Sequence, residues 1–388
     1  MKVKPAERTN TVQEYYFSAK LRQIDQMRRS GIDVINLGIG SPDMPPPPAA
    51  VKRLTEEAAK PNVHGYQSYN GVPEFRKALA GWYFRYFGVT LDPENEILPL
   101  IGSKEGIMHI SMAFVNPGDE VLVPDPGYPS YSSVTRLVGG VVRTYDLLEK
   151  NDWLPDFIAL ENTDLSNVKL MWVNYPNMPT GRKASPALFE RLVKFAVRHR
   201  ILVCNDNPYS FILNNQFTSI LVADGAKDIA LELNSLSKSH NMAGWRLGMV
   251  AGHSEYISSV LKVKSNMDSG MFLPVQLAAA EALLQGNEWY ESINSVYARR
   301  RKIAGEIMNL LGCNYDTEQT GMFLWGRINE RFRNGAELSD QVLEISNVFI
   351  TPGFIFGKNG DNYVRISLCT REEILEKAKE RIEKQFKN

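Results

Sequence analysis

The sequence predicts an α/β fold, with a large domain built on a mainly parallel sheet and a smaller α+β domain. The chain has 388 residues, enough for two or three domains of ordinary size. Several short apolar runs have the pattern of buried strands and are each followed by loop residues and a helical pattern: Glu96–Leu100, Glu120–Val123, Lys169–Val173 and Ile201–Cys204. Strands that alternate with helices are typical of parallel sheets covered by helices.

The clearest predicted helix lies between the last two of these runs. Ser185 suits the N-cap and Pro186 the first helical position. Apolar residues share one face and basic residues follow at the end: Leu188, Leu192, Phe195 and Ala196, then His199 and Arg200. This helix predicts a right-handed crossover between two parallel strands.

A run of four prolines, Pro45–Pro48, precedes the predicted sheet. Because proline fixes φ and lacks an N–H donor, we expect this run to lie outside helices and central strands, as a rigid domain boundary. We therefore expect residues 1–45 to form an N-terminal arm and part of the small domain. Residues 46–288 would form the large domain.

Residues 289–388 have the pattern of the rest of a small α+β domain. A long charged helix begins at about Trp289, and an amphipathic helix begins at Arg371. Between them, apolar runs around Met322–Trp325 and Val364–Leu368 predict a pair of strands. The small domain is thus expected to contain segments from both chain ends.

The composition excludes several classes of function. Lysine plus arginine equals aspartate plus glutamate at 44 each, so no net charge recruits nucleic acid or an anionic membrane surface. Cys204, Cys313 and Cys369 lack the spacing of a zinc site or a disulfide framework. Met1–Asn10 is polar, and no apolar run reaches the roughly 18 residues of a membrane span. We expect a cytoplasmic protein that binds no metal and acts on a small molecule.

Lys238 and Arg246 lie in a segment rich in small hydroxyl residues. A lysine in this setting can attack an aldehyde carbon, and Ser235, Ser237 and Arg246 can donate hydrogen bonds to a phosphate dianion. Pyridoxal phosphate carries both an aldehyde and a phosphate. An exposed lysine in a polar turn would give the same local pattern, so the other segments decide.

Three further segments follow predicted strands. Gly102–Gly106 opens an apolar helix, so its backbone N–H groups can face an anion. Asp206 and Tyr209 stand at the carboxyl end of a strand, where α/β proteins bind ligands, and Tyr128 lies in a proline-braced loop where it can stack on a planar ring. The alternatives are a plain loop, a turn aspartate and a packed aromatic residue.

The order of these segments resembles that of the class I/II aminotransferases of pyridoxal phosphate fold type I. The resemblance runs from Asn36 to Leu368 and includes Tyr175–Gly181 and Val364–Ser367. It implies a seven-stranded sheet flanked by helices, the cofactor pyridoxal 5'-phosphate, and an amino acid and a 2-oxo acid as substrates. It also implies a homodimer with shared active sites.

The same resemblance implies a role for each matching residue. Lys238 would bind the cofactor covalently and move the proton, Asp206 would pair with the ring nitrogen, Tyr209 would donate to the ring hydroxyl, and Tyr128 would stack on the ring. The phosphate would be held by Ser103, Lys104, Ser235, Ser237 and Arg246, and by Tyr66 of the neighbouring subunit. The substrate carboxylate would lie against Arg365 and Gly40.

The chain departs from the family pattern at one position. The family usually has asparagine directly before Pro-Thr-Gly, where its amide donates to the ring hydroxyl, but this chain has Met178 there and Asn177 one residue earlier. A thioether cannot make that hydrogen bond, although it can pack against the ring edge. We do not assign the asparagine role to Asn177.

Other functions are compatible with parts of this pattern. The segments Gly102–Gly106, Pro124–Pro129 and Lys264–Phe272 most resemble the branch with LL-diaminopimelate and alanine-type aminotransferases. The same fold also supports β-elimination by carbon-sulfur lyases, and non-catalytic sensors bind the same cofactor. A dinucleotide enzyme is disfavoured, since no G-x-G-x-x-G follows the first strand.

Overall fold

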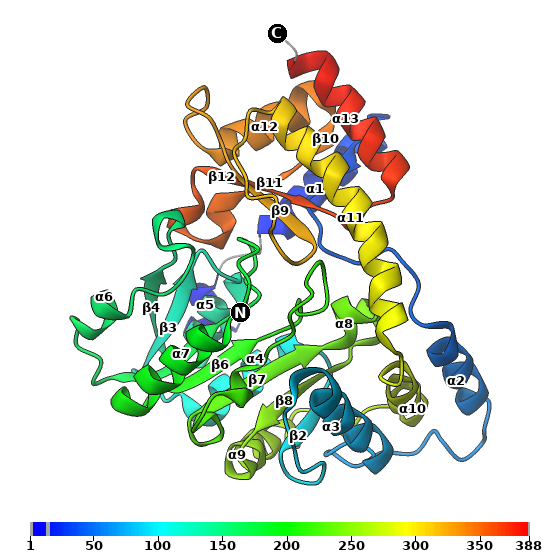
Figure 1. Ribbon diagram of the computed structural model, residues 1–388, viewed down its shortest axis with the longest axis vertical. Coiled ribbons are helices and arrows are strands. Elements are labelled where there is room, and N and C mark those ends of the chain that lie inside the picture. The colour runs from blue at the N-terminus through cyan, green and yellow to red at the C-terminus, as the bar shows by residue number, and fades with distance from the viewer. Residues whose placement is uncertain (1–2, 13–15, 387–388) are drawn as a thin grey trace.

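The structure is a computed structural model that describes residues 3–12 and 16–386. A seven-stranded sheet covered by helices forms the lower part in Figure 1, and a three-stranded and a two-stranded sheet lie in the upper part. The predicted fold class is therefore confirmed. No helix in the described ranges is long and apolar enough to cross a membrane.

The large sheet has the strand order β2-β8-β7-β6-β5-β3-β4. Its strands are β2 (Ile97–Leu100), β3 (Glu120–Asp125), β4 (Val141–Asp146), β5 (Val168–Val173), β6 (Leu202–Asp206), β7 (Ala230–Ser235) and β8 (Gly248–Gly252). Of these seven strands, β8 alone runs in the direction opposite to the other six. The four strands predicted from apolar runs are confirmed as β2, β3, β5 and β6, whereas β4, β7 and β8 were not predicted individually.

The helices connect and cover these strands. Their bounds are α1 (Tyr16–Arg29), α2 (Pro48–Ala58), α3 (Pro73–Phe87), α4 (Ser103–Phe114), α5 (Pro129–Leu137), α6 (Phe157–Glu161), α7 (Pro186–His199), α8 (Leu236–Ser239), α9 (Ser254–Lys264), α10 (Leu273–Ala282), α11 (Asn287–Leu310), α12 (Gly335–Ser346) and α13 (Glu372–Phe386). The predicted start of α7 is confirmed, because Ser185 Oγ accepts a hydrogen bond from Leu188 N at 3.2 Å.

The large sheet is buried on both faces, as its apolar strands predict. In β5, Leu170 and Trp172 belong to one hydrophobic cluster together with residues of α4 and α9. Met171 and Val173 point the other way, into a cluster that contains Leu192 of α7. This alternation with period two gives three layers, helix on sheet on helix.

The smaller sheets combine both ends of the chain. Strand β1 (Ile35–Asn36) pairs in parallel with β10 (Val348–Phe349). The predicted strand pair is confirmed, since β9 (Phe323–Arg327) and β12 (Tyr363–Ser367) are antiparallel, and β11 (Thr351–Pro352) completes the sheet.

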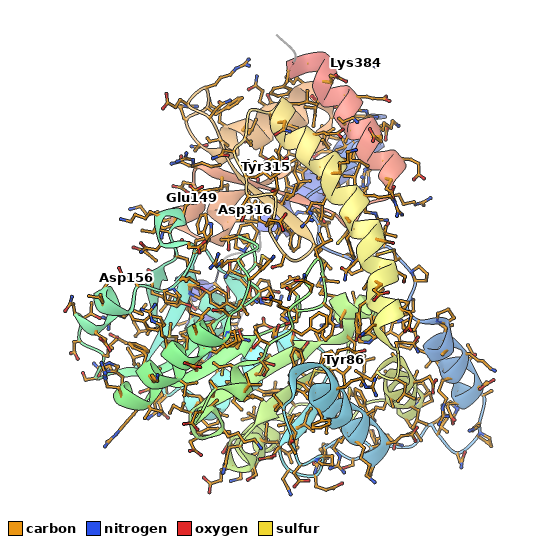
Figure 2. All side chains as sticks on the ribbon, viewed as in Figure 1. Tyr86, Glu149, Asp156, Tyr315, Asp316 and Lys384 are labelled. Atoms are coloured by element: carbon orange, nitrogen blue, oxygen red, sulfur yellow. The ribbon has the colours of Figure 1, made fainter. Side chains whose placement is uncertain are left out.

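A side-chain contact links the two parts. Glu149, labelled in Figure 2, accepts a hydrogen bond from the Tyr363 hydroxyl of β12 at 2.9 Å. Glu149 belongs to the segment that follows β4 of the large sheet. This hydrogen bond therefore joins the segment after β4 of the large sheet to the three-stranded small sheet.

One prediction about the proline run is wrong at its last residue. Pro48 is the first residue of α2, not part of a segment outside all helices. The first residue of a helix needs no N–H donor and has the φ that proline already adopts, so proline is well suited there. Pro45–Pro47 do lie outside helices and strands.

Candidate active site

A cavity of about 410 Å³ lies at the carboxyl ends of the large sheet, below the small sheets. The structure brings eleven of the twelve predicted site residues to its wall: Gly40, Ser103, Lys104, Tyr128, Asp206, Tyr209, Ser235, Ser237, Lys238, Arg246 and Arg365. The twelfth, Tyr66, is 93% exposed and lies outside this wall. Its predicted contact with a neighbouring subunit stays a prediction.

One end of the cavity is built to hold an anion. Ser103 is the first residue of α4, where backbone N–H groups have no partner within the helix. Gly102 has φ +84°, and a Cβ atom there would lie 2.3 Å from Arg246 Nη2, so the close approach of the guanidinium requires glycine. Ser235 Oγ lies 2.9 Å from Ser237 Oγ and accepts from Ser237 N at 3.1 Å. Hydroxyls, a guanidinium and a helix N-terminus thus converge on one point.

Lys238 lines the cavity from the short helix α8. Its Nζ donates to the carbonyl oxygen of Gly40 at 2.5 Å. Burial lowers the pKa of the Lys238 amine below its ordinary value. A lowered pKa increases the neutral fraction, which is the form that attacks carbonyl carbons.

Asp206 is buried at the end of β6, and one of its carboxylate oxygens has no partner. Its Oδ2 accepts from the Tyr131 hydroxyl at 2.9 Å, whereas Oδ1 is buried without a hydrogen bond. Burial raises the pKa of Asp206 to about 6. A buried carboxylate oxygen without a donor is costly, so the site favours a ligand that brings a cationic N–H group to Oδ1.

Two aromatic residues flank Asp206. The rings of Tyr128 and Tyr131 lie 5.6 Å apart, and Tyr131 stacks on Trp172 at 5.1 Å. Tyr131 was not predicted, although its spacing of three residues from Tyr128 at a helix start places both on one side. Tyr209 is buried in the wall, and burial raises the pKa of its hydroxyl. That hydroxyl therefore stays protonated and able to donate a hydrogen bond.

Arg365 lines the cavity from β12. Its Nη2 donates to the Gly38 carbonyl oxygen at 2.9 Å, and its guanidinium lies 3.8 Å from the ring centre of Phe323 and 4.6 Å from that of Phe356. A Cβ atom on Gly40 would lie 2.2 Å from Phe323 Cζ, so only glycine fits there. The guanidinium is thus held in one orientation at the cavity wall.

Met178 lines the cavity and Asn177 does not. The Met178 Sδ atom lies 3.2 Å from Arg365 Nη1. Asn177 donates from Nδ2 to the Asn174 carbonyl oxygen at 3.1 Å and accepts from the Thr180 hydroxyl at 2.8 Å, which turns its side chain into its own loop. Asn177 is therefore not available in place of the missing asparagine.

Asn174 also lines the cavity and was not predicted as a site residue. Its Nδ2 donates to the Asp206 carbonyl oxygen at 2.5 Å, and its Oδ1 accepts from Met178 N at 2.8 Å. The residue directly follows β5, and this position at a strand end was the signal that could have identified it. Asn174 ties the ends of β5 and β6 together under the site.

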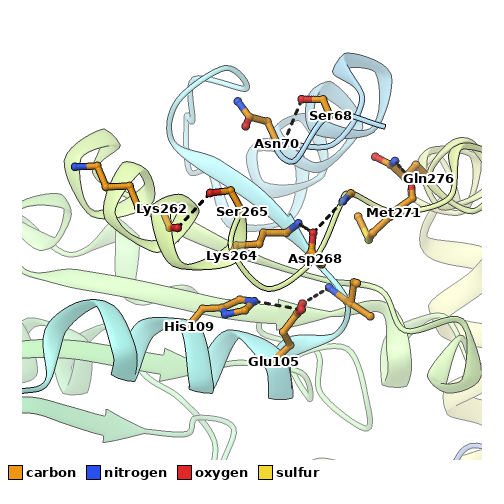
Figure 3. A network of polar contacts seen from close by, with 12 residues as sticks. Ser68, Asn70, Glu105, His109, Lys262, Lys264, Ser265, Asp268, Met271 and Gln276 are labelled. Atoms are coloured by element: carbon orange, nitrogen blue, oxygen red, sulfur yellow. Dashed lines mark hydrogen bonds and ion pairs between the residues drawn. The ribbon is translucent and has the colours of Figure 1, made fainter. Parts of the chain in front are cut away.

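A network of polar contacts, partly buried, lies next to the anion-binding end (Figure 3). Glu105 accepts from Ile101 N at 2.6 Å, and the His109 ring lies 3.2 Å from its other oxygen. Asp268 lies beside them and pairs with Lys264 at 2.7 Å. Because Ile101 precedes Gly102, the Glu105 carboxylate fixes the backbone that leads into the helix N-terminus of the anion site.

Comparisons with known proteins agree on one family. The family model described as aminotransferase class I and II matches residues 32–382. LL-diaminopimelate aminotransferase of Oleidesulfovibrio alaskensis is 42% identical over 384 residues, which cover 97% of this chain and 98% of that protein. The apo structure of BacF from Bacillus subtilis is 35% identical with a TM-score of 0.95, and covers 100% of this chain and 99% of that one. A mutant aspartate aminotransferase from Thermus thermophilus is 27% identical with a TM-score of 0.91, covering 99% and 100%.

The cavity fits the cofactor on which this family depends. Pyridoxal phosphate has a phosphate for the helix N-terminus at Ser103, an aldehyde for the Lys238 amine and a ring nitrogen for the unpartnered Oδ1 of Asp206. The predicted aminotransferase activity and cofactor are therefore confirmed, and β-elimination is not favoured. The chain belongs to the class I and II aminotransferases and is a pyridoxal-phosphate-dependent enzyme.

Proposed function

We propose that this enzyme moves an amino group between an L-amino acid and a 2-oxo acid in a ping-pong cycle, with Lys238 as its catalytic residue. The observation that carries the proposal is the position of the Lys238 amine, with a lowered pKa, in one cavity with the anion site, Asp206 and Arg365. When bound, pyridoxal phosphate supplies the electron sink. The protein supplies the base, the charges and the orientation.

The other residues of the wall have proposed binding roles. Asp206 holds the charge of the ring nitrogen, Tyr209 donates to the ring hydroxyl, and Tyr128 stacks on the ring. The phosphate is held by Ser103, Lys104 through its backbone, Ser235, Ser237 and Arg246. Arg365 binds the substrate carboxylate as a fork, and Gly40 leaves room for it.

The proposed function is tested by a half-reaction screen. Purified holoenzyme is mixed with each amino acid in the absence of a 2-oxo acid, and the long-wavelength absorbance of the lysine-bound cofactor is followed. A transaminase loses this absorbance once and regains it when a 2-oxo acid is added. Continuous release of pyruvate or another 2-oxo acid without any acceptor would instead indicate β-elimination.

We also propose that the enzyme is a cytoplasmic homodimer in which Tyr66 reaches the phosphate of the partner's cofactor. The 93% exposure of the Tyr66 side chain supports an intermolecular role. We likewise propose that residues 1–45 form an N-terminal arm and part of the small domain, that residues 46–288 form the large domain, and that residues 289–388 form the rest of the small domain. Sedimentation velocity is expected to give a dimer, and Tyr66→Phe is expected to weaken cofactor binding. A monomer with full cofactor affinity would rule out the shared site.

The network behind the phosphate gives a prediction about cofactor affinity. Glu105→Leu removes the acceptor of Ile101 N, so the backbone leading into α4 loses its fixed position. We expect the dissociation constant for pyridoxal phosphate to rise about tenfold, the lower end for a hydrogen bond to a charged group. Fluorescence titration of cofactor-free protein measures this. Glu105→Gln should change affinity less, because it retains an acceptor, and Glu291→Leu on α11 is the exposed control. Unchanged affinity in Glu105→Leu would contradict the supporting role.

Asp206 gives a prediction about stability and pH. Its pKa is about 6 in the folded chain against 3.8 as the ordinary value, so the folded state holds the proton more tightly. This stabilisation is fully present below about pH 4 and is lost as the pH rises to about 6. In cofactor-free protein, we expect the free energy of unfolding of the wild type to fall by about 3 kcal/mol relative to that of Asp206→Asn between pH 4 and pH 7, because only the wild type must ionise a buried carboxyl group. Urea unfolding at several pH values measures the difference. Parallel pH curves for the two proteins would show that Asp206 ionises normally.

A further inference from the structure

Lys238 lies in a helix that is too short to be stable on its own. Helix α8 has four residues, Leu236–Ser239, whereas isolated helices shorter than about 12 residues are marginal in water. The direction of the Lys238 side chain therefore depends on contacts that other parts of the chain make with this segment. Figure 1 shows the start of the long helix α11 near α8, and side chains of its first four residues supply two of these contacts.

Ser239, the residue directly after Lys238, is held through both of its oxygen atoms. Its carbonyl oxygen accepts a hydrogen bond from Trp289 Nε1 of α11 at 2.9 Å. Its Oγ atom lies 2.9 Å from Nδ1 of His240 and donates to the carbonyl oxygen of Ser235 at 3.3 Å. Ser235 also carries one of the hydroxyls of the anion site. The His240 ring is thereby linked to the chain on both sides of Lys238.

The imidazole of His240 is fully buried and uncharged. Its exposed fraction is 0%, and burial lowers the pKa of the ring to about 3. A neutral imidazole has one donor nitrogen and one acceptor nitrogen, so its neighbours decide which nitrogen carries the proton. Nδ1 faces Ser239 Oγ, and Nε2 lies 3.3 Å from the hydroxyl oxygen of Tyr290. Because a ring without exposed surface cannot contact a second copy of the chain, these neighbours belong to one subunit.

The Tyr290 hydroxyl determines the position of the His240 proton. Trp82 Nε1, which can only donate, gives its hydrogen bond to the Tyr290 oxygen at 2.9 Å. The Tyr290 proton then needs an acceptor, and within residues 3–12 and 16–386 the hydrogen-bond partner that can accept it is His240 Nε2. A buried hydroxyl proton without an acceptor is strongly unfavourable. Nε2 therefore accepts, and the ring proton lies on Nδ1.

These groups form one chain of hydrogen bonds that runs in a single direction. Each member donates to the next, in the order Trp82, Tyr290, His240, Ser239 and the carbonyl oxygen of Ser235. Reversing one link would leave a buried donor or acceptor without a partner, so the links stabilise one another.

We propose that His240 is a positioning residue for the amino-transfer reaction: its Nδ1–H group, oriented by Tyr290, fixes Ser239 and thereby the direction of the Lys238 amine. This inference rests on the proposed function, in which Lys238 is the catalytic residue. The His240 ring does not line the cavity, and Arg365 does. The effect of His240 is therefore expected in the rate of the step at Lys238 and not in the binding of the amino acid.

Two amide variants separate the roles of the two ring nitrogens. An asparagine amide reaches the place of Nδ1, so His240→Asn keeps a donor for Ser239 Oγ. A glutamine amide reaches the place of Nε2, so His240→Gln keeps a partner for Tyr290 and loses that donor. His240→Leu loses both contacts.

The half-reaction of purified holoenzyme is measured with the amino acid that reacts fastest with the wild type, over a range of its concentrations. We expect the rate constant at saturation to fall about 10- to 100-fold in His240→Gln and His240→Leu. In His240→Asn it should stay within about threefold of the wild type. The dissociation constant of the amino acid should change by less than about threefold in all three variants.

Phe217→Leu is the control for a loss of packing in the same region. The Phe217 ring centre lies 6.5 Å from that of Tyr290, but Phe217 has no part in the hydrogen-bond chain. Urea unfolding is expected to show a lower free energy of unfolding for Phe217→Leu, with an unchanged half-reaction rate constant. If this variant slows the half-reaction as much as His240→Gln does, the effect comes from packing and the inference is wrong.

The position of the proton is measured without any reaction. The chain has five histidines, and the ¹⁵N signals of His240 in labelled holoenzyme are identified by their absence in His240→Asn. We expect a protonated Nδ1 and an unprotonated Nε2, both unchanged between about pH 5 and about pH 8. Tyr290→Phe should remove this preference for one nitrogen. A wild-type ring protonated on Nε2 would overturn the inference, whether or not the variants fold.

The outcomes distinguish the inference from the function on which it rests. If no amino acid removes the absorbance of the lysine-bound cofactor in the wild type, the proposed function is wrong. If the wild type reacts and His240→Asn is no faster than His240→Gln, the proposed function stands and the inference is wrong.

Discussion

Lys238→Ala is expected to lower the rate of transamination by about 10⁴-fold or more, while pyridoxal phosphate still binds without a covalent bond. The amine is both the proposed covalent partner of the cofactor and the base that moves the proton, and each role contributes substantially to the rate. The anion site at Ser103 and the carboxylate of Asp206 do not involve the lysine, so they continue to hold the cofactor.

Two measurements on this variant are needed. Steady-state turnover reports the loss of activity, and the absorbance spectrum after gel filtration reports bound cofactor that lacks the lysine linkage. Lys262→Ala removes an exposed lysine of α9 and is the matched control, with expected wild-type turnover. Near-normal turnover of Lys238→Ala would overturn the assignment of the catalytic residue.

Arg365→Lys has the second largest expected effect. The guanidinium can form two parallel hydrogen bonds with a carboxylate, and stacking on Phe323 and Phe356 holds it in place. An ammonium has neither the fork nor the planar face. We expect the transition state to lose about 2 to 5 kcal/mol of stabilisation. This loss corresponds to a roughly 30- to 5000-fold decrease in kcat/KM for the amino acid.

A control variant and a comparison of substrates test the role of Arg365. Arg327→Lys changes an exposed arginine of β9 in the same small sheet and should leave kcat/KM unchanged. Amines without a carboxylate should react poorly with the wild-type enzyme. If they react as well as amino acids do, then Arg365 does not bind the substrate carboxylate.

The strands that the sequence predicts and those it misses differ for physical reasons. Strands β5 and β6 are continuous apolar runs and are easily recognised. In β7, the fully buried Glu232 and Asn234 interrupt the apolar pattern, and Asn205 Nδ2 donates to Glu232 at 3.0 Å. In β8, a Cβ atom on Gly248 would lie 2.6 Å from Ser103 N, so the approach of the anion site imposes glycine where strand formers are expected.

The site residues likewise divide into those that the sequence predicts and those that it misses. Lys238, Asp206 and Arg365 stand in local motifs, so the sequence alone brings them forward as candidates. Tyr131 lies in no such motif, and neither do Phe17 and Leu21, the residues of α1 that line the cavity. Their neighbours are distant in sequence, as in the pair of Tyr131 with Asp206, which are 75 residues apart, and only the folded arrangement of strand ends selects them.

The central claim is that Lys238 carries the cofactor in an amino-transferring site. The most direct measurement is reduction of the holoenzyme with borohydride, followed by peptide mapping by mass spectrometry. The mass of the reduced cofactor is expected on the peptide that contains Lys238, and prior incubation with a reactive amino acid should prevent the labelling. Labelling of Lys104 or of another lysine, or labelling that no amino acid prevents, would contradict the account.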